Sequence, residues 1–425
     1  MATVHVIGAG LAGLSCAVRA TLAGCKVAVY EAAPQAGGRC RSLYDEGLGC
    51  LIDNGSHMLL GANRATLTYL DDIGAAQLVH EIRPAGFPFL EPASGRLWTL
   101  RPGTPWLPLW LFSPNRRVPG SSPRDYLEVL SLARAGARDR IGDLVNRAGP
   151  LYERLWQPMS RAALNTDADE ASAKLLWRVV LETFMKGEAA CRPMIFTEGL
   201  TPTLIDPALK LLAAKGAEVR YQARLRGVRW QDDRAIALHF PEGLLRVEAD
   251  DAVVLAVPPD VCAELWPPIN PPQETRPILN VHFRMAEPVK LPGDYPFLGL
   301  IGTDSHWLFA RGNVLSVTVS AAERLIDRQN IDLASHIWSE VVHALGRNMG
   351  RLPPWRVIKE RRATIAQTPA VIGRRPGAET AVANLVIAGD WTDTGLPATI
   401  ESAIRSGVTA ARLAMRAIER AMKSG

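Results

Sequence analysis

The feature that most constrains this chain is a glycine-rich turn that begins at its eighth residue. Residues 8–13 read Gly-Ala-Gly-Leu-Ala-Gly, a G-x-G-x-x-G pattern between a β-rich run, Thr3–Ile7, and a predicted helix of small residues. In such a turn Gly8 allows the sharp bend, Gly10 lets a diphosphate approach the backbone, and Gly13 lets the helix pack closely on the strand. The amides at the start of the helix favour an anion. We therefore predict a β-α-β unit that binds a dinucleotide.

Two features that follow the turn support this prediction. Glu31 ends the second predicted strand, 18 residues after Gly13, where a carboxylate can bind ribose hydroxyls. Residues 37–41 then read Gly-Gly-Arg-Cys-Arg. Gly38 and Arg39 in this segment suit extra phosphate neutralisation and contact with an isoalloxazine edge. A nicotinamide dehydrogenase has no need of such a segment here, so the predicted cofactor is FAD.

A third motif lies almost a whole chain away. Residues 385–390 read Leu-Val-Ile-Ala-Gly-Asp, a predicted strand that ends in Gly389 and Asp390 and leads to a long terminal helix from Thr399. A carboxylate at Asp390 can bind a ribityl hydroxyl. The helix N-terminus near Thr399 can face the pyrimidine edge of the flavin, which carries negative charge when reduced. The motif therefore predicts an FAD domain that is closed by its last helix.

A compact polar cluster, Asp53-Asn54-Gly55-Ser56-His57, lies between two apolar runs. Polar groups in an apolar surround are costly to bury, so we interpret the cluster as placed to line a site in a lipid pocket. A direct catalytic role for His57 or Asp53 is the alternative. Glu401, in the first turns of the terminal helix, is a third candidate for acid–base chemistry.

Length and composition exclude several classes of protein. The chain has 425 residues, which suggests two or three domains at about 150 residues each. A net charge of +5 without a run of five basic residues argues against nucleic-acid binding. The six cysteines form no CxxC pair, so neither a metal site nor a disulfide framework is expected. No apolar run is long enough to span a membrane, and the N-terminus enters a strand directly, so we predict a cytoplasmic protein.

These patterns predict an α/β fold with a discontinuous, Rossmann-like FAD-binding domain and a substrate domain of mixed sheet plus inserted helices. The predicted FAD domain comprises residues 1–83, 200–260 and 380–425, and the predicted substrate domain residues 84–199 and 261–379. Inserted helices are predicted near Pro123–Gly136, Ala137–Trp156 and Ser172–Lys186.

Taken together, the motifs resemble those of the FAD-dependent amine oxidase/phytoene desaturase superfamily. A narrower resemblance, to the hydroxysqualene dehydroxylases (the squalene-associated FAD-dependent desaturase family), rests on DNGSHMLLGA at 53–62 and AGDWTDTGLPATIESAIRSG at 388–407. The resemblance implies FAD contacts from Gly8, Gly10, Gly13, Glu31, Arg39 and Asp390. It also implies adenine bonds from the backbone of Leu225, on the strand after the turn at Gly216.

The same resemblance implies the reductive removal of the hydroxyl of hydroxysqualene, in the squalene and hopanoid pathways of bacteria, with hydride from reduced flavin. The acid that protonates the leaving hydroxyl stays open among His57, Asp53 and Glu401. A carotenoid-type desaturase, which runs the hydride transfer in the other direction, is an alternative. A non-enzymatic prenyl-lipid carrier, related to the GDP-dissociation inhibitors, is another.

The partners implied are an isoprenoid lipid substrate and an electron donor of unknown kind, because only one G-x-G-x-x-G follows a strand and no NADPH domain is visible. The stretch Leu97–Phe112 contains Trp98, Trp106 and Trp110 among leucines and prolines. Interfacial tryptophans would suit peripheral contact with the inner face of the membrane. Ordinary core of the second domain is the alternative interpretation of this stretch.

Overall fold

A five-stranded parallel sheet carries the glycine-rich turn. The computed structural model describes residues 2–103, 109–346 and 351–424, and the strand order of this sheet is β10-β2-β1-β14-β20. The strands are β1 (Thr3–Ile7), β2 (Lys26–Tyr30), β10 (Glu218–Arg220), β14 (Ala252–Leu255) and β20 (Leu385–Ile387). All neighbours pair in parallel, so the turn after β1 and the Gly389-Asp390 motif after β20 lie at the same edge.

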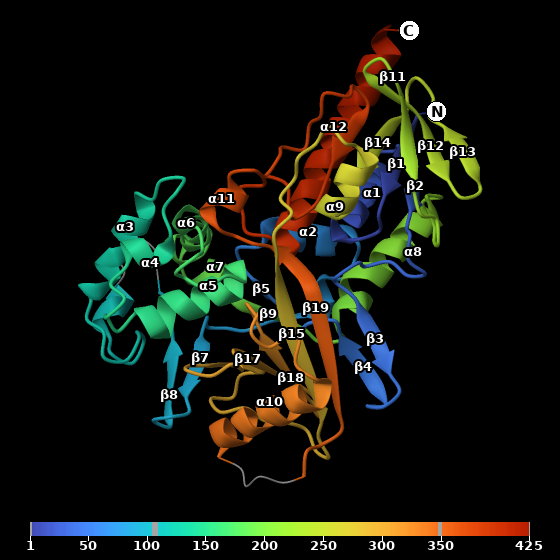
Figure 1. Ribbon diagram of the computed structural model, residues 1–425. Helices are drawn as coiled ribbons and strands as arrows, with labels where there is room; N and C mark the ends of the chain where they lie inside the picture. Colours follow the sequence, from blue (N-terminus) through green and yellow to red (C-terminus); the bar gives the residue numbers. More distant parts are fainter. Residues whose placement is uncertain (1, 104–108, 347–350, 425) are drawn as a thin grey trace.

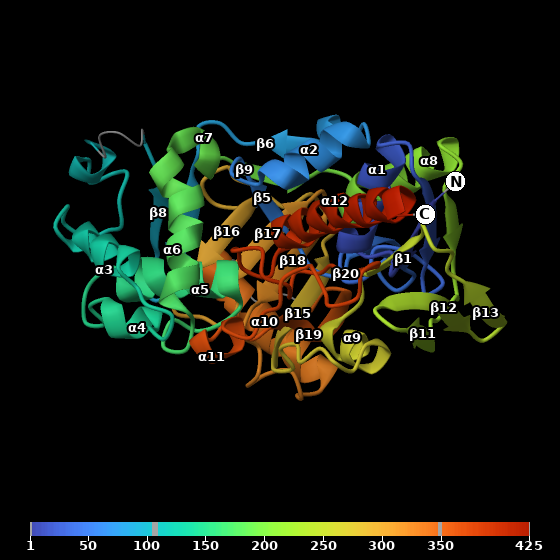
Figure 2. The ribbon, with the colours of Figure 1, turned by 90° about the horizontal axis from the view of Figure 1, so that it is seen from above.

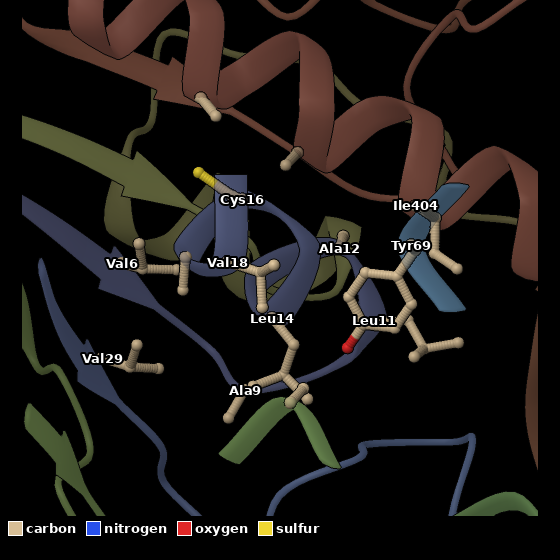
Figure 3. Packing of buried hydrophobic residues seen from close by; sticks show 14 of the residues in the cluster. Val6, Ala9, Leu11, Ala12, Leu14, Cys16, Val18, Val29, Tyr69 and Ile404 are labelled. Atoms are coloured by element: carbon tan, nitrogen blue, oxygen red, sulfur yellow. The ribbon is translucent and has the colours of Figure 1, made fainter. Parts of the chain in front are cut away.

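Both faces of this sheet are covered, as the wholly apolar sequences of β14 and β20 require. α1 (Leu11–Leu22) and α12 (Ile400–Ser424) lie on one face (Figures 1 and 2), where Val6, Leu14 and Ile404 belong to one buried cluster (Figure 3). The opposite face packs on α9 and on a small three-stranded sheet. These elements are α9 (Pro259–Leu265), β11 (Gly227–Gln231), β12 (Arg234–Phe240) and β13 (Gly243–Arg246).

The second region of the molecule is built on a seven-stranded mixed sheet with the strand order β19-β15-β18-β17-β16-β7-β8. Its strands are β7 (Phe87–Glu91), β8 (Arg96–Leu100), β15 (Thr275–Arg284), β16 (Phe297–Leu300), β17 (Trp307–Arg311), β18 (Val314–Val319) and β19 (Trp355–Ile365). α10 (Asn330–Leu345) packs on one face through buried apolar residues of both elements. The other face contributes Phe89, Phe297 and Trp307 to a core shared with the inserted helices.

The helical insertion is present but more broken than predicted. It contains α3 (Val129–Ala133), α4 (Ile141–Leu144), α5 (Gln157–Leu164), α6 (Ala173–Glu182) and α7 (Glu188–Cys191). The helical stretch predicted near Ala137–Trp156 is only partly helical, because α4 ends at Leu144, a turn follows, and helical structure resumes as a π-helical turn at Tyr152–Trp156 that runs into α5. Gly149-Pro150 explains the interruption, since proline lacks an amide donor and disfavours helical backbone in the residue before it.

A three-stranded antiparallel sheet, β5-β9-β6, joins the two regions. It consists of β5 (Met58–Leu60), β6 (Val79–Glu81) and β9 (Pro193–Phe196), and a hairpin of β3 (Ser42–Asp45) and β4 (Cys50–Asp53) precedes it. The predicted fold class, an α/β dinucleotide-binding core with a second region of mixed sheet and helices, is confirmed. The domain boundaries stay a prediction. Among the described residues no helix combines the length and apolar sequence needed to cross a bilayer.

The closest helix contact in the core is between α1 and α12, and a glycine makes it possible. A Cβ built on Gly407 would lie 2.1 Å from the carbonyl oxygen of Ala12 and 2.2 Å from Oγ of Ser15. Ser15 Oγ donates a hydrogen bond of 2.8 Å to the carbonyl of Ile404 across the same contact. The two helices therefore meet backbone to backbone.

We predict that Gly407→Ala forces α1 and α12 apart and lowers the free energy of unfolding by about 1–3 kcal/mol, the usual cost of overpacking. Thermal unfolding of the holoprotein measures the effect. Gly377→Ala is the matched control, because a Cβ at Gly377 meets no atom within 4 Å. Wild-type unfolding temperatures for both variants would show that the helices separate without cost.

Candidate active site

The glycine turn is packed tightly against its neighbours at Gly8 and Gly13 and has free space beside Gly10. Gly8 has φ +103°, and a Cβ there would lie 2.4 Å from the carbonyl oxygen of Ala256. A Cβ on Gly13 would lie 1.9 Å from the carbonyl oxygen of Gly8, so helix and strand touch. A Cβ on Gly10 would meet no atom within 4 Å. Gly10 also begins α1 without a side-chain cap, so the first amides of the helix face the open side.

The second glycine segment lies directly against this turn. Gly37 donates a hydrogen bond of 2.8 Å from its amide to the carbonyl of Ala9, and a Cβ on Gly38 would lie 3.4 Å from Cα of Gly10. Gly38 has φ +57°, which favours glycine. The two motifs that the sequence separates therefore line one opening, and Arg39 follows at its rim.

Arg39 connects the N-terminal and C-terminal motifs. Its Nη2 donates a hydrogen bond of 2.7 Å to Oδ1 of Asp390, and its Nη1 donates one of 2.5 Å to the carbonyl of Ala363. The Asp390 side chain is buried, whereas that of Arg39 is 43% exposed. The carboxylate of Asp390 raises the pKa of Arg39, so the guanidinium stays charged.

Glu31 lies where the sequence predicts, at the end of β2 beside the turn. Its carboxylate accepts hydrogen bonds from the amides of Ala9, at 2.7 Å, and Ala33, at 2.8 Å. These two bonds fix its orientation and leave further lone pairs of both oxygens for a ligand.

Leu225 is not on a strand, and this part of the prediction was wrong. β10 ends at Arg220, and Leu225 lies in the irregular segment before β11. The bond from the amide of Ala223 to the carbonyl of Glu31, 2.8 Å, brings this segment to the end of β2. In the described parts of the chain, the backbone of Leu225 has no hydrogen bond, and its contact with adenine stays a prediction.

The terminal motif is held in place by its own side chains. Gly389 has φ +156°, and a Cβ there would lie 2.4 Å from Nε1 of Trp391. Thr399 caps α12, since its Oγ1 accepts a hydrogen bond of 3.3 Å from the amide of Ser402. Sequence reasoning missed Arg375, which is buried and donates to the carbonyls of Asp390, at 3.0 Å, and Leu396, at 2.6 Å.

Asp53 is buried and engaged as an acceptor on both oxygens. Oδ1 accepts from Oγ of Ser42, at 2.6 Å, and from the amide of Leu200, at 3.0 Å. Oδ2 pairs with Nη1 of Arg311 at 2.7 Å. Both oxygens of Asp53 are thus engaged as acceptors from a cation, a hydroxyl and an amide, so Asp53 is poorly suited to donate a proton to a ligand. It joins β4 to the second sheet instead.

Glu401 is held by the start of a neighbouring helix. Its buried carboxylate accepts hydrogen bonds from the amides of Ala65, at 3.0 Å, and Thr66, at 2.9 Å, which start α2 (Arg64–Asp72). It also accepts from Oγ1 of Thr66 at 2.8 Å and pairs with Arg405 at 3.2 Å. Glu401 caps a neighbouring helix, and its role in acid–base chemistry stays a prediction.

His57 presents a different environment. Its side chain is exposed, yet burial by the surrounding protein lowers the pKa of the imidazole. Nδ1 lies 2.7 Å from the carbonyl oxygen of Gly55. A carbonyl only accepts, so Nδ1 carries the proton of the neutral ring and Nε2 is the free nitrogen.

The comparisons with known proteins agree with this geometry. The family model for flavin containing amine oxidoreductases matches residues 11–415. An oxidoreductase from Methanosarcina mazei shares the fold, with a TM-score of 0.73 at 15% identity over 96% of this chain and 100% of that one. The chain belongs to the flavin containing amine oxidoreductase family.

Two curated relatives are much more similar in sequence. The hydroxysqualene dehydroxylase of Rhodopseudomonas palustris is 48% identical, over 98% of this chain and 99% of the relative. That of Sinorhizobium fredii is 43% identical, over 97% and 98% of the two chains. Within the family, the chain therefore groups with the hydroxysqualene dehydroxylases.

FAD is the cofactor, and the residues present fit it. The open side of Gly10 admits a diphosphate, and the fixed carboxylate of Glu31 lies at the ribose end of the turn. Asp390 and the N-terminus of α12 are at the same sheet edge and suit the ribityl chain and the flavin ring.

We predict that Glu31→Ala weakens FAD binding by roughly 1–3 kcal/mol, about 5- to 150-fold, because ribose bonds are lost. FAD retention after serial dilution and rebinding to the apoprotein measure the change. Glu218→Ala is the control, since Glu218 lies on the adjacent β10 and pairs only with Arg220 at the surface. Unchanged retention in Glu31→Ala would show that Glu31 is not the ribose ligand.

Proposed function

We propose that this chain removes the hydroxyl group of hydroxysqualene reductively and forms squalene, with FAD as cofactor. The observation that carries the proposal is the 48% identity, over almost the whole of both chains, with a hydroxysqualene dehydroxylase. A single dinucleotide site beside one exposed imidazole in an otherwise engaged polar cluster supports it.

The chemistry requires three components. The hydroxyl of the substrate is allylic, so the positive charge that its departure leaves on carbon is delocalised. FAD in its reduced form supplies the hydride that this carbon receives. A proton must reach the hydroxyl so that it leaves as water, and the alcohol, one proton and one hydride then give the hydrocarbon and water. The electron donor that restores reduced FAD is a partner of unidentified kind.

The protein groups favour His57 as the proton donor. Asp53 and Glu401 accept several hydrogen bonds each, which leaves them without a proton to give. Neutral His57 has only the Nε2 lone pair left to offer, so it can accept a hydrogen bond from a hydroxyl but not protonate it. Protonated His57 gains an Nε2–H that can donate. Because desolvation lowers its pKa, this form is a stronger acid than an ordinary imidazolium.

The direction of hydride transfer separates this proposal from a carotenoid-type desaturase, which needs oxidised flavin. The names of both curated relatives describe removal of a hydroxyl, which favours reduction. Turnover with reduced or with oxidised enzyme under anaerobic conditions distinguishes the two. A lipid carrier without redox chemistry would bind the isoprenoid but would not turn it over with either reduced or oxidised flavin.

We predict that His57→Ala keeps its FAD but slows single-turnover flavin reoxidation by hydroxysqualene roughly 10²–10⁴-fold, the usual contribution of a general acid. Anaerobic stopped-flow mixing of pre-reduced enzyme with substrate measures the rate. In the wild type the rate should be highest at low pH and fall as pH rises through a value below 6.5, because the acid must be protonated and its pKa is lowered.

Two outcomes would contradict this role. A wild-type rate in His57→Ala would show that the proton comes from another group. A rate that rises with pH through the same range would show that neutral His57, as a hydrogen-bond acceptor, is the active form. His80→Ala is the control, since His80 lies on β6 and is exposed.

We also propose that the insertion meets the inner face of the membrane, from which an isoprenoid substrate would enter. Leu109, Phe112, Leu127 and Leu130 are between 48% and 69% exposed. Trp110 and Tyr126 join their two segments, with ring centroids 5.8 Å apart. Arg124, Arg134 and Arg138 are exposed in the same region and suit anionic headgroups. Trp98 is buried in the core, and Trp106 lies outside the described residues.

We predict that replacing Leu109 and Phe112 together by serine weakens binding to phosphatidylglycerol-containing vesicles by roughly tenfold or more, because apolar contact with the bilayer is lost. Vesicle flotation measures the bound fraction. Leu244→Ser is the matched control, since Leu244 is 53% exposed on β13, far from the insertion (Figure 1). Equal flotation of all three proteins would rule out this surface.

A further inference from the structure

The loop that carries His57 is hydrogen-bonded to the seven-stranded sheet through Asn280. Asn280 lies on β15 and is 2% exposed. Its Nδ2 donates a hydrogen bond of 3.2 Å to the carbonyl of Asn54. A Cβ on Gly55 would lie 3.0 Å from the same Nδ2, so the amide packs directly against the loop. The next carbonyl along this backbone, that of Gly55, is the one that accepts from Nδ1 of His57.

The orientation of the Asn280 amide is itself determined by its neighbour on β18. Oγ1 of Thr318 donates a hydrogen bond of 2.8 Å to Oδ1 of Asn280, and the two residues are cross-strand partners. With Oδ1 occupied as an acceptor, Nδ2 is the atom that faces Asn54. A chain of hydrogen bonds therefore runs from Thr318 through Asn280 to the backbone of the loop.

The same loop is also hydrogen-bonded to the segment that carries Arg39, on the predicted flavin side of the site. Asn54 donates from its amide to the carbonyl of Arg41, at 2.8 Å, and from Nδ2 to the carbonyl of Arg39, at 3.1 Å. Arg39 in turn pairs with Asp390. Asn54 is thus clamped between the cofactor segment and Asn280, and the Gly55 carbonyl has little freedom to turn.

We propose that Asn280, oriented by Thr318, is a positioning residue for His57. It holds the Gly55 carbonyl where it selects the Nδ1–H tautomer, so that the free Nε2 faces the reacting hydroxyl. A residue of the second sheet then determines which nitrogen the substrate meets, in keeping with the general need for supporting contacts behind a catalytic group. This inference rests on the proposed role of His57.

The test compares Asn280→Asp and Thr318→Val with Ser316→Ala. Asn280→Asp keeps the shape but replaces the donor by an acceptor that repels the Asn54 carbonyl, and Thr318→Val removes only a hydroxyl. Ser316 is the matched control because it lies on the same sheet face, two residues from Thr318, and contacts His282 instead of the loop, at 2.7 Å. FAD content and thermal unfolding verify that each holoprotein is folded.

We expect single-turnover flavin reoxidation to slow by roughly tenfold or more in Asn280→Asp, by less in Thr318→Val, and not in Ser316→Ala. ¹⁵N spectra of histidine-labelled holoprotein should show His57 as the Nδ1–H tautomer in wild type and as a mixture in Asn280→Asp. If Asn280 acts through His57, adding Asn280→Asp to His57→Ala should cause no further slowing.

Two results would overturn the proposal: an unchanged tautomer in Asn280→Asp, or equal slowing by Asn280→Asp with and without His57. A wild-type rate in His57→Ala would refute the acid role of His57 instead. In that case the tautomer spectra still test whether Asn280 positions the ring, so the two failures are distinguishable. If Asn280→Asp does not fold, Thr318→Val carries the same comparison.

Discussion

The ion pair between Arg39 and Asp390 is the contact on which the site depends. It joins residues 351 positions apart and brings the N-terminal glycine segment against the strand that enters the last helix. Asp390 is buried, so loss of the guanidinium would leave a desolvated negative charge without a partner. The buried Arg375 holds the backbone of the same residue from behind. Neither end of the chain can form the cofactor site without the other.

The three residues predicted from the sequence as candidate acids are distinguished by their hydrogen-bond partners. Asp53, His57 and Glu401 all lie in or near apolar surroundings, and sequence spacing does not rank them. Glu401 accepts two amides and a hydroxyl at the start of α2, and Asp53 accepts an amide, a hydroxyl and an arginine. Of these three, His57 alone keeps an atom without a hydrogen bond to any described residue, since its bond to the Gly55 carbonyl uses Nδ1 and leaves Nε2. Counting hydrogen bonds therefore separates a group that can react from groups that hold the fold.

The parts of the fold that follow local rules could be predicted from the sequence. The turn at Gly8 needs a positive φ, which favours glycine, and β20, just before Asp390, is an unbroken apolar run. Each feature can therefore be recognised from a few consecutive residues. The helical stretch predicted near Ala137–Trp156 is interrupted, because Gly149-Pro150 breaks it between α4 and the helical turn at Tyr152–Trp156.

Long-range partners could not be predicted, because a single sequence carries no local sign of them. Asn280 meets the loop across 226 positions of sequence, and Glu401 reaches α2 across 335. A buried asparagine in a β-strand reads locally as an interruption of the apolar pattern. Its hydrogen bond to Asn54 becomes visible only when the two sheets are placed together. Sequence reasoning therefore found the residues of the local motifs and missed long-range partners such as Asn280 and Arg375.

One face of the seven-stranded sheet shows how the two regions cooperate. Cross-strand neighbours place side chains on the same face of a sheet, so register defines rows. One row runs Asn280, Thr318, Trp307, Gly299, Phe89 and Trp98, and a parallel row runs His282, Ser316, Phe309 and Phe297. Each row is polar on β15 and β18 and aromatic from β17 onward. Gly299 leaves room for the rings, since a Cβ there would lie 2.5 Å from Phe89.

The polar end of these rows supports the loop of His57, and the aromatic end merges with the core under the insertion. Buried hydrogen-bonding groups are stable only with partners, and Asn280 finds them in the hydroxyl of Thr318 and the carbonyl of Asn54. The aromatic end needs no such partners and is stabilised by burial against the insertion. The register of this sheet thus joins the loop of His57 to the core under the inserted helices, so the two regions fold as one support for the site.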